Sequence, residues 1–111
     1  LKHHKNLGVH TEMFSDGFLN LYEAGCITNS NKQEHKGKLV ATFAVGTQKV
    51  FDFIDDNPCV NILETNYIND INVIGSNPDV VSVNSCLQID LSGQVVTDSI
   101  GLNIYSGVGG H

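Results

Sequence analysis

Hydrophobic residues in the first quarter of the chain follow a strand-like pattern and then a helical one. Residues 7–10 (LGVH) are typical of the end of a short strand. Ser15 or Asp16 can cap a helix. The apolar positions around them recur at helical spacing: Phe14, Phe18, Leu21 and Tyr22. Gly25 suits the left-handed position after a last helical turn. The pattern predicts a strand, a short loop and a helix of about three turns, followed by a polar surface loop over 29–38.

The longest apolar run lies in the middle of the chain, at residues 39–45 (LVATFAV). Uncharged runs rich in small and β-branched residues are typical of strands covered on both faces in parallel sheets. We therefore predict a central, buried strand here. After Gly46, three apolar positions indicate a second short helix: Val50, Phe53 and Ile54. Residues 60–62 predict a third strand, and residues 65–79 a loop with one helical turn at 70–74.

The last third of the chain changes to a period-two pattern. Apolar residues occupy alternate positions at Val81, Val83, Leu87, Ile89 and Leu91. Ser92-Gly93 is a turn signal, after which residues 94–97 return as a strand. The order strand-helix-strand-helix-strand followed by a hairpin predicts an α/β fold. Its sheet is expected to be mostly parallel and flanked by helices, with an antiparallel hairpin near the C-terminus.

Composition and charge narrow the classes of function. The 111 residues are 41% hydrophobic and 16% charged, which suits a small globular domain or part of one, and no apolar run approaches the ~20 residues of a membrane span. The net charge of -6 argues against a nucleic-acid partner. Three widely spaced cysteines, Cys26, Cys59 and Cys86, predict reduced thiols in a cytosolic or organellar compartment. Both chain ends look cut, so we expect a fragment.

Glu12 is the first candidate for chemistry. It follows a predicted strand end and is flanked by apolar residues. Ligands of open α/β sheets bind beyond the carboxyl ends of the strands, where a carboxylate that has lost part of its water shell could act as a nucleophile or base. The alternative is a carboxylate stabilised by the dipole of the following helix. His10 lies two residues before Glu12, so both side chains would share one face of a strand.

The glycine-rich end is the second candidate. Gly107, Gly109 and Gly110 would let backbone N–H groups approach a phosphate or an oxyanion. The segment is neither a dinucleotide fingerprint nor a P-loop, and a plain tight turn is the alternative. No HExxH or comparable ligand spacing is present, so we predict no metal site.

The segment 7–17 (LGVHTEMFSDG) resembles the acetyl-CoA hydrolase/transferase family, most closely its 4-hydroxybutyrate CoA-transferase branch. The similarity continues through YEAG, KLVATF, YIND, VSVNS and QIDLSGQ, and it ends at YSGVGG, so it covers nearly the whole chain. The resemblance implies a domain of the NagB/RpiA/CoA transferase-like fold. It also implies that residues 1–111 are part of the C-terminal domain, which carries the catalytic glutamate. The N-terminal CoA-transferase domain and the end of the C-terminal domain would then be absent, and the fragment alone is expected to be inactive.

By the same resemblance, Glu12 is the nucleophile that attacks an acyl-CoA thioester and becomes a glutamyl-CoA thioester. Asn69 inherits an oxyanion contact, and the glycine loop, with Gly107, Gly109 and Gly110, inherits CoA and substrate contacts. Coenzyme A and a small carboxylic acid are then substrates, with no permanently bound cofactor. The full-length enzyme is expected to be a homo-oligomer, cytoplasmic or in the mitochondrial matrix. The alternatives are an acyl-CoA hydrolase with the same intermediate and a non-catalytic α/β module that binds a nucleotide or partner.

Overall fold

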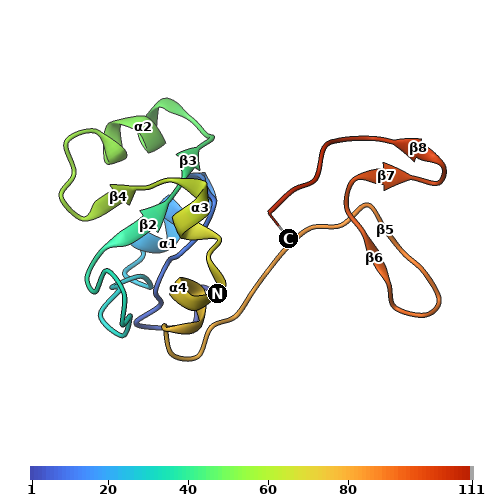
Figure 1. Ribbon diagram of the computed structural model, residues 1–111. Coiled ribbons are helices and arrows are strands. Elements are labelled where there is room, and N and C mark those ends of the chain that lie inside the picture. The colour runs from blue at the N-terminus through green and yellow to red at the C-terminus, as the bar shows by residue number, and fades with distance from the viewer. Residues whose placement is uncertain (111) are drawn as a thin grey trace. The chain divides into compact units, whose positions relative to one another are not determined.

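The computed structural model describes residues 1–110, which divide into two units: Leu1–Val80 and the residues from Val81 onward (Figure 1). The first unit holds all four helices of the described residues. Its elements are β1 (Met13–Phe14), α1 (Asp16–Glu23), β2 (Leu39–Ala41), β3 (Phe43–Ala44), α2 (Gln48–Ile54), β4 (Val60–Ile62), α3 (Thr65–Ile68) and α4 (Ile71–Gly75). Strands and helices alternate along this unit, which is the predicted α/β class.

Strand pairing in the first unit is parallel throughout. β1 pairs with β3, β2 pairs with β4, and an isolated parallel bridge joins His10 to Val40. The segment that contains β2 and β3 therefore lies between the residues around β1 and those of β4. This central position and the parallel pairing confirm the prediction for residues 39–45.

The same segment is nevertheless shorter and less buried than predicted. Leu39–Ala41 is fully buried, but the strand is interrupted at Thr42, and Phe43 and Val45 are 43% and 55% exposed. The physical reason lies in the backbone, because the N–H groups of Thr42 and Phe43 both donate to the carbonyl of Glu12, at 2.9 and 3.1 Å. Two successive donors on one acceptor break the regular ladder, and the strand partner changes from β4 to β1.

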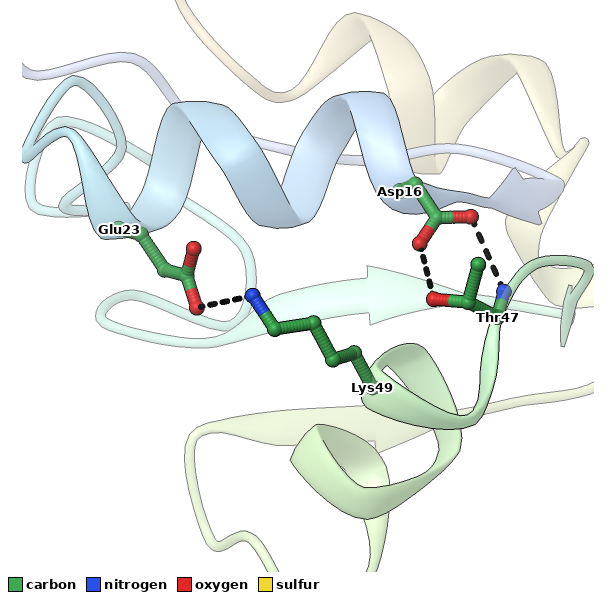
Figure 2. A network of polar contacts seen from close by, with 4 residues as sticks. All are labelled: Asp16, Glu23, Thr47 and Lys49. Carbon is green, nitrogen blue, oxygen red and sulfur yellow. Dashed lines mark hydrogen bonds and ion pairs between the residues drawn. The ribbon is translucent and has the colours of Figure 1, made fainter.

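α1 begins after Ser15, as predicted, but its eight residues make it about one turn shorter than expected. It ends before Gly25, whose φ of 73° is the left-handed conformation that glycine adopts without strain. Figure 2 shows how α1 is tied to the start of α2. The Asp16 carboxylate accepts hydrogen bonds from the backbone N–H of Thr47 at 3.0 Å and from its hydroxyl at 2.5 Å.

The hydrogen bonds from Thr47 also change the pKa of Asp16. The hydroxyl of Thr47, followed by its backbone N–H, lowers the pKa of Asp16 below its usual value. A second, looser contact joins the same two helices, with 4.0 Å between Lys49 Nζ and Glu23 Oε1 (Figure 2). Gly46 precedes Thr47, and a Cβ there would lie 2.6 Å from Asp16 Oδ2, so a side chain at this position would displace the Asp16 carboxylate.

A single cluster of buried side chains forms the core of the first unit. Its members come from both strands and helices: Val9, Phe14, Leu19, Ile27, Leu39, Ala41 and Val50. Phe14 is fully buried and stacks on Phe18 and Phe53, with ring centroids 5.8 and 5.9 Å apart. The helical apolar positions predicted from the sequence therefore do face the strands.

The polar stretch 29–38 has no helix or strand, but it is not merely a surface loop as predicted. Asn29 and Lys32 are buried. Asn29 Oδ1 accepts from the N–H of Val9 at 2.8 Å, while Lys32 Nζ donates to the carbonyls of Val9 and Lys38, both at 2.9 Å. Burial lowers the pKa of Lys32 to about 8. The two polar side chains thus bind the backbone just ahead of Glu12.

The second unit consists of two antiparallel hairpins, β5 (Gln88–Ile89) with β6 (Val95–Val96) and β7 (Ser99–Ile100) with β8 (Asn103–Ile104). The first hairpin confirms the predicted turn, where Gly93 has a φ of 86°. The second hairpin was not predicted. The long alternating strand expected from residue 81 is wrong, because only Gln88–Ile89 is strand. Residues 81–86 have no regular secondary structure, and their side chains are exposed, whereas the N–H of Leu87 already donates to the carbonyl of Val96 at 2.8 Å.

All three cysteines carry free thiols: Cys26 is buried, Cys59 is half-buried and Cys86 is exposed. Among the described residues, no helix is long and apolar enough to cross a membrane.

Candidate active site

Glu12 lies where the N-terminal segment passes beside the interruption between β2 and β3. Its carbonyl accepts the N–H groups of Thr42 and Phe43, and the N–H of the preceding Thr11 donates to the carbonyl of Val40 at 3.0 Å. The backbone on both sides of Glu12 is therefore fixed against the central segment. Glu12 as a whole is half-buried, and the hydrogen bond made by its carboxylate is exposed, so the carboxylate is reachable from solvent.

Asn69 is the residue that the structure brings to this carboxylate. Its side-chain Nδ2 donates to Glu12 Oε2 at 3.2 Å, although the two residues are 57 positions apart in the sequence. Asn69 ends α3, and its own N–H donates to the carbonyl of Thr65 at 2.9 Å. An amide donor thus contacts one oxygen of the carboxylate and leaves the second oxygen without a protein donor among the described residues.

The short helices on either side of Asn69 fix the corner from which its side chain projects. Asp70 follows directly and caps α4, because its Oδ1 accepts from the N–H groups of Asn72 and Val73 at 2.8 and 3.1 Å. Ile68, immediately before Asn69, is buried. A buried side chain on one side and a helix cap on the other leave the Asn69 backbone little freedom.

His10 and Glu12 both contact the end of α3, although Glu12 lies in a bend and not in a strand. The Nε2 of His10 lies 2.6 Å from the carbonyl of Ile68, the neighbour of Asn69. This contact was not predicted, since an acceptor on a distant backbone leaves no signal in the residue pattern. Close by, the buried Oγ1 of Thr42 has no hydrogen-bond partner among the described residues.

The three predicted glycines lie in the second unit, after β8. Gly107, Gly109 and Gly110 are exposed and have no regular secondary structure, and His111 lies outside the described residues. A Cβ built on Gly107 would meet no atom within 4 Å, so the fold of this unit does not itself require glycine there. The pair that the structure brings together is Glu12 and Asn69, within the first unit.

Two other features of the described residues bear on the chemistry. No group of three or more His, Cys, Asp or Glu side chains is placed to hold a metal ion in residues 1–110. An open pocket is lined by His35, Leu63, Glu64 and Tyr67, and neither Glu12 nor Asn69 is among its lining residues. Glu12 and Asn69 are the two predicted site residues that the structure brings into contact.

Comparison with known proteins identifies the class to which this fold and site belong. The family described as "Acetyl-CoA hydrolase/transferase C-terminal domain" matches residues 46–111. Because the match covers more than half of the chain, the chain belongs to the acetyl-CoA hydrolase/transferase family.

Individual relatives agree with this assignment. The chain is 56% identical over 110 residues to a succinyl-CoA:acetate/propanoyl-CoA:succinate CoA transferase of Fasciola hepatica, covering 99% of this chain and 23% of that protein. It is 52% identical to a 4-hydroxybutyrate coenzyme A transferase of Clostridium kluyveri, covering 99% and 26%. The chain thus spans about a quarter of the length of the curated relatives that it matches.

Solved structures of the same class share the fold. The crystal structure of RipA from Yersinia pestis matches with a TM-score of 0.91 and 37% identity, over 99% of this chain and 25% of that one. A 4-hydroxybutyrate CoA-transferase from Porphyromonas gingivalis matches with a TM-score of 0.79 and 42% identity, over 83% and 24%. The predicted CoA-transferase-like α/β fold is confirmed.

Proposed function

We propose that this chain is part of the C-terminal domain of a CoA-transferase. The enzyme would move CoA between an acyl-CoA thioester and a small carboxylic acid, such as 4-hydroxybutyrate or butyrate with acetate. The observation that carries the proposal is the hydrogen bond from Asn69 Nδ2 to Glu12 Oε2, in a chain whose relatives are named CoA transferases. The N-terminal domain and the end of the C-terminal domain would lie outside this chain.

In the first step, Glu12 Oε1 attacks the carbonyl carbon of the thioester. The carbon–sulfur bond breaks, CoA leaves as a thiolate, and an acyl-glutamyl anhydride remains. Because a carboxylate is a weak nucleophile, the site must hold it aligned with the thioester. The backbone bonds on both sides of Glu12 and the amide on Oε2 supply that alignment. The oxygen that lacks a protein donor is the one free to attack.

In the second step, the CoA thiolate attacks the Glu12 carboxyl carbon, and negative charge develops on Oε2. Asn69 Nδ2 already contacts this oxygen, so its amide stabilises the oxyanion without moving. Collapse breaks the bond between the Glu12 carbon and Oε1, which leaves with the acyl group as a carboxylate. An acceptor carboxylate then takes CoA from the glutamyl thioester by the reverse steps.

The glycine loop supplies the remaining contacts in this proposal. Backbone N–H groups of Gly109 and Gly110 would contact the thioester, with Gly107 giving the loop its conformational freedom. CoA and the carboxylic acid are substrates, and no permanently bound cofactor is required. We further propose a homo-oligomer in the cytoplasm, or in the mitochondrial matrix of a eukaryote.

The decisive experiment traps the covalent intermediate. The full-length enzyme is incubated with acyl-CoA and then borohydride, which reduces a glutamyl thioester and gives a defined mass change on the peptide that contains Glu12. Glu12→Gln should abolish this label and lower turnover on the order of 10⁴-fold or more, while Glu64→Gln is a matched control at an exposed glutamate. An unlabelled Glu12 in an active enzyme would remove it from the mechanism.

Two further measurements define the reaction. Asn69→Ala should lower kcat by about 10²- to 10³-fold, the usual effect of losing one oxyanion donor. Asn66→Ala, on the exposed surface of the same helix, should leave kcat unchanged. Product analysis with and without acetate separates a transferase from a hydrolase: a transferase forms acetyl-CoA, whereas a hydrolase releases free CoA in both cases. Acyl-CoA binding without turnover would favour the non-catalytic module.

A further inference from the structure

Two hydrogen bonds connect the segment that carries Glu12 to the end of α3. His10 Nε2 lies 2.6 Å from the carbonyl of Ile68, and Asn69 Nδ2 lies 3.2 Å from Glu12 Oε2. Two of the four residues are the last residue of α3 and its C-cap, and the other two lie two positions apart in the N-terminal segment. The backbone joins the two residues on each side, so a displacement of either element changes both hydrogen bonds together.

The chemistry of the His10 bond is fixed by its acceptor. A carbonyl oxygen only accepts, so Nε2 must carry the proton and donate it. The other ring nitrogen, Nδ1, is buried and has no partner among the described residues. The imidazole therefore makes one hydrogen bond, and that bond is directed at α3.

α3 needs such an external bond because it is only four residues long. The last carbonyls of a helix have no partner within the helix, and Ile68 supplies one of them. His10 satisfies this carbonyl from the neighbouring segment. A second histidine also reaches α3, since His35 Nε2 lies 2.9 Å from the hydroxyl of Tyr67, but that contact is exposed and ends on a flexible side chain.

We propose that His10 is a positioning residue: by holding the carbonyl of Ile68, it fixes the end of α3 so that the Asn69 amide reaches Glu12. The inference rests on the proposed function, because Glu12 and Asn69 are the proposed nucleophile and oxyanion donor. His10 itself transfers no proton and contacts no substrate in this role. Its effect on the reaction passes through Asn69.

The test is a double-mutant cycle in the full-length enzyme. His10→Phe keeps a ring of similar size but removes the donor, and it should lower kcat about 10- to 100-fold through the misplaced amide, with the KM for acyl-CoA within about twofold. In an Asn69→Ala background the same change should lower kcat less than about threefold, because its target is already gone. Equal effects in the two backgrounds would overturn the proposal.

A pair of conservative variants provides a second test that does not depend on His10→Phe folding. His10→Gln places an N–H donor within reach of Ile68, whereas His10→Asn is one methylene shorter and falls short. The glutamine variant should retain kcat within about fivefold, and the asparagine variant should resemble His10→Phe. His35→Gln is the matched control and should stay near wild type. Equal losses in the Gln and Asn variants, or an equal loss in His35→Gln, would reject a specific role for His10.

Crystal structures of the variants add a readout that is independent of activity. Asn69 Nδ2 should lie beyond hydrogen-bonding distance of Glu12 Oε2 in His10→Asn and within it in His10→Gln. An unchanged contact in both variants would overturn the inference. If Glu12→Gln keeps full activity, the proposed function fails; if Glu12→Gln is inactive while every His10 variant is fully active, only the positioning role fails.

Discussion

The two units of the chain use similar apolar content in different ways. In Leu1–Val80, seven buried side chains from strands, helices and the segments between them form one cluster. From Val81 onward, the apolar side chains are exposed apart from the half-buried Val96. Local turns define the second unit, since each hairpin pairs only two residues per strand. Two-stranded hairpins are marginally stable in water, so burial stabilises the first unit to a degree that the second does not share.

The largest expected effect separates the two units directly. Phe14 is fully buried and stacked between two other rings, so Phe14→Ala should lower the unfolding free energy of the isolated chain by about 3–5 kcal/mol. Leu91 is wholly exposed, and Leu91→Ala should change it by less than about 0.5 kcal/mol. Equilibrium urea unfolding measures both. If Leu91→Ala lowers the unfolding free energy only in the full-length protein, then another part of that protein covers the Leu91 side chain.

A smaller effect is expected where a glycine is required by packing. A Cβ at Gly46 would lie 2.6 Å from Asp16 Oδ2 and 2.8 Å from Val50 Cγ2, so Gly46→Ala must displace the link between α1 and α2. We expect a loss of about 1–3 kcal/mol. Gly107→Ala in the second unit meets no atom within 4 Å and should be nearly neutral in the same unfolding experiment. Similar losses of unfolding free energy for Gly46→Ala and Gly107→Ala would contradict the contrast between the two units.

The buried amine of Lys32 should make the stability of the first unit depend on pH. Burial lowers the pKa of Lys32 to about 8 from an ordinary value of 10.5, so between these values the folded state binds fewer protons than the unfolded state. The unfolding free energy contributed by Lys32 should therefore rise with pH from about 8 to 10.5. The neutral amine still has two N–H donors for the carbonyls of Val9 and Lys38.

The measurement compares wild type with Lys32→Met by urea unfolding across this pH range. The stability difference between the two should shift in favour of wild type as the pH rises. Lys36→Met, at an exposed position in the same loop, is the control and should show no such trend. A constant difference between wild type and Lys32→Met would contradict the expectation.

The smallest effects concern one carboxylate in each unit. The Thr47 hydroxyl lowers the pKa of Asp16, and the Ser92 hydroxyl, followed by the N–H of Gln94, lowers the pKa of Asp90 in the β5–β6 turn. The stability that each group contributes is present above its unfolded pKa and is lost as the pH falls through its lower folded value. Carboxyl carbon shifts measured by NMR should place both midpoints below 3.8, and Thr47→Val and Ser92→Ala should raise them separately.

Local signals in the sequence located much of the first unit. The helical spacing around Phe18 predicted α1, and the uncharged run at residues 39–45 predicted the central segment. The turn at Ser92-Gly93 predicted the first hairpin. Each of these depends on residues close together in the chain, where side-chain pattern and backbone conformation are directly related.

The features that were missed depend on distant backbone atoms. Lys32 appeared to be a solvent-exposed residue, because only the folded chain brings the carbonyls of Val9 and Lys38 to its amine. The interruption at Thr42 was hidden within an apolar run, since it results from two N–H groups sharing one carbonyl. Asn69 was selected by family resemblance alone, and only the fold shows that its amide reaches Glu12. The alternating pattern from Val81 failed because alternation specifies faces of a strand without supplying a partner strand.

The shared carbonyl of Glu12 also bears on the order in which the molecule opens. Amide protons exchange with solvent only when their hydrogen bonds break, and bonds in the core break in the rarest openings. The N–H groups of Thr42 and Phe43 donate to the carbonyl of Glu12 and directly follow the fully buried β2 in the chain. They should exchange far more slowly than those of the exposed hairpins. If so, the proposed nucleophile would keep its backbone geometry through local fluctuations that transiently unfold the hairpins.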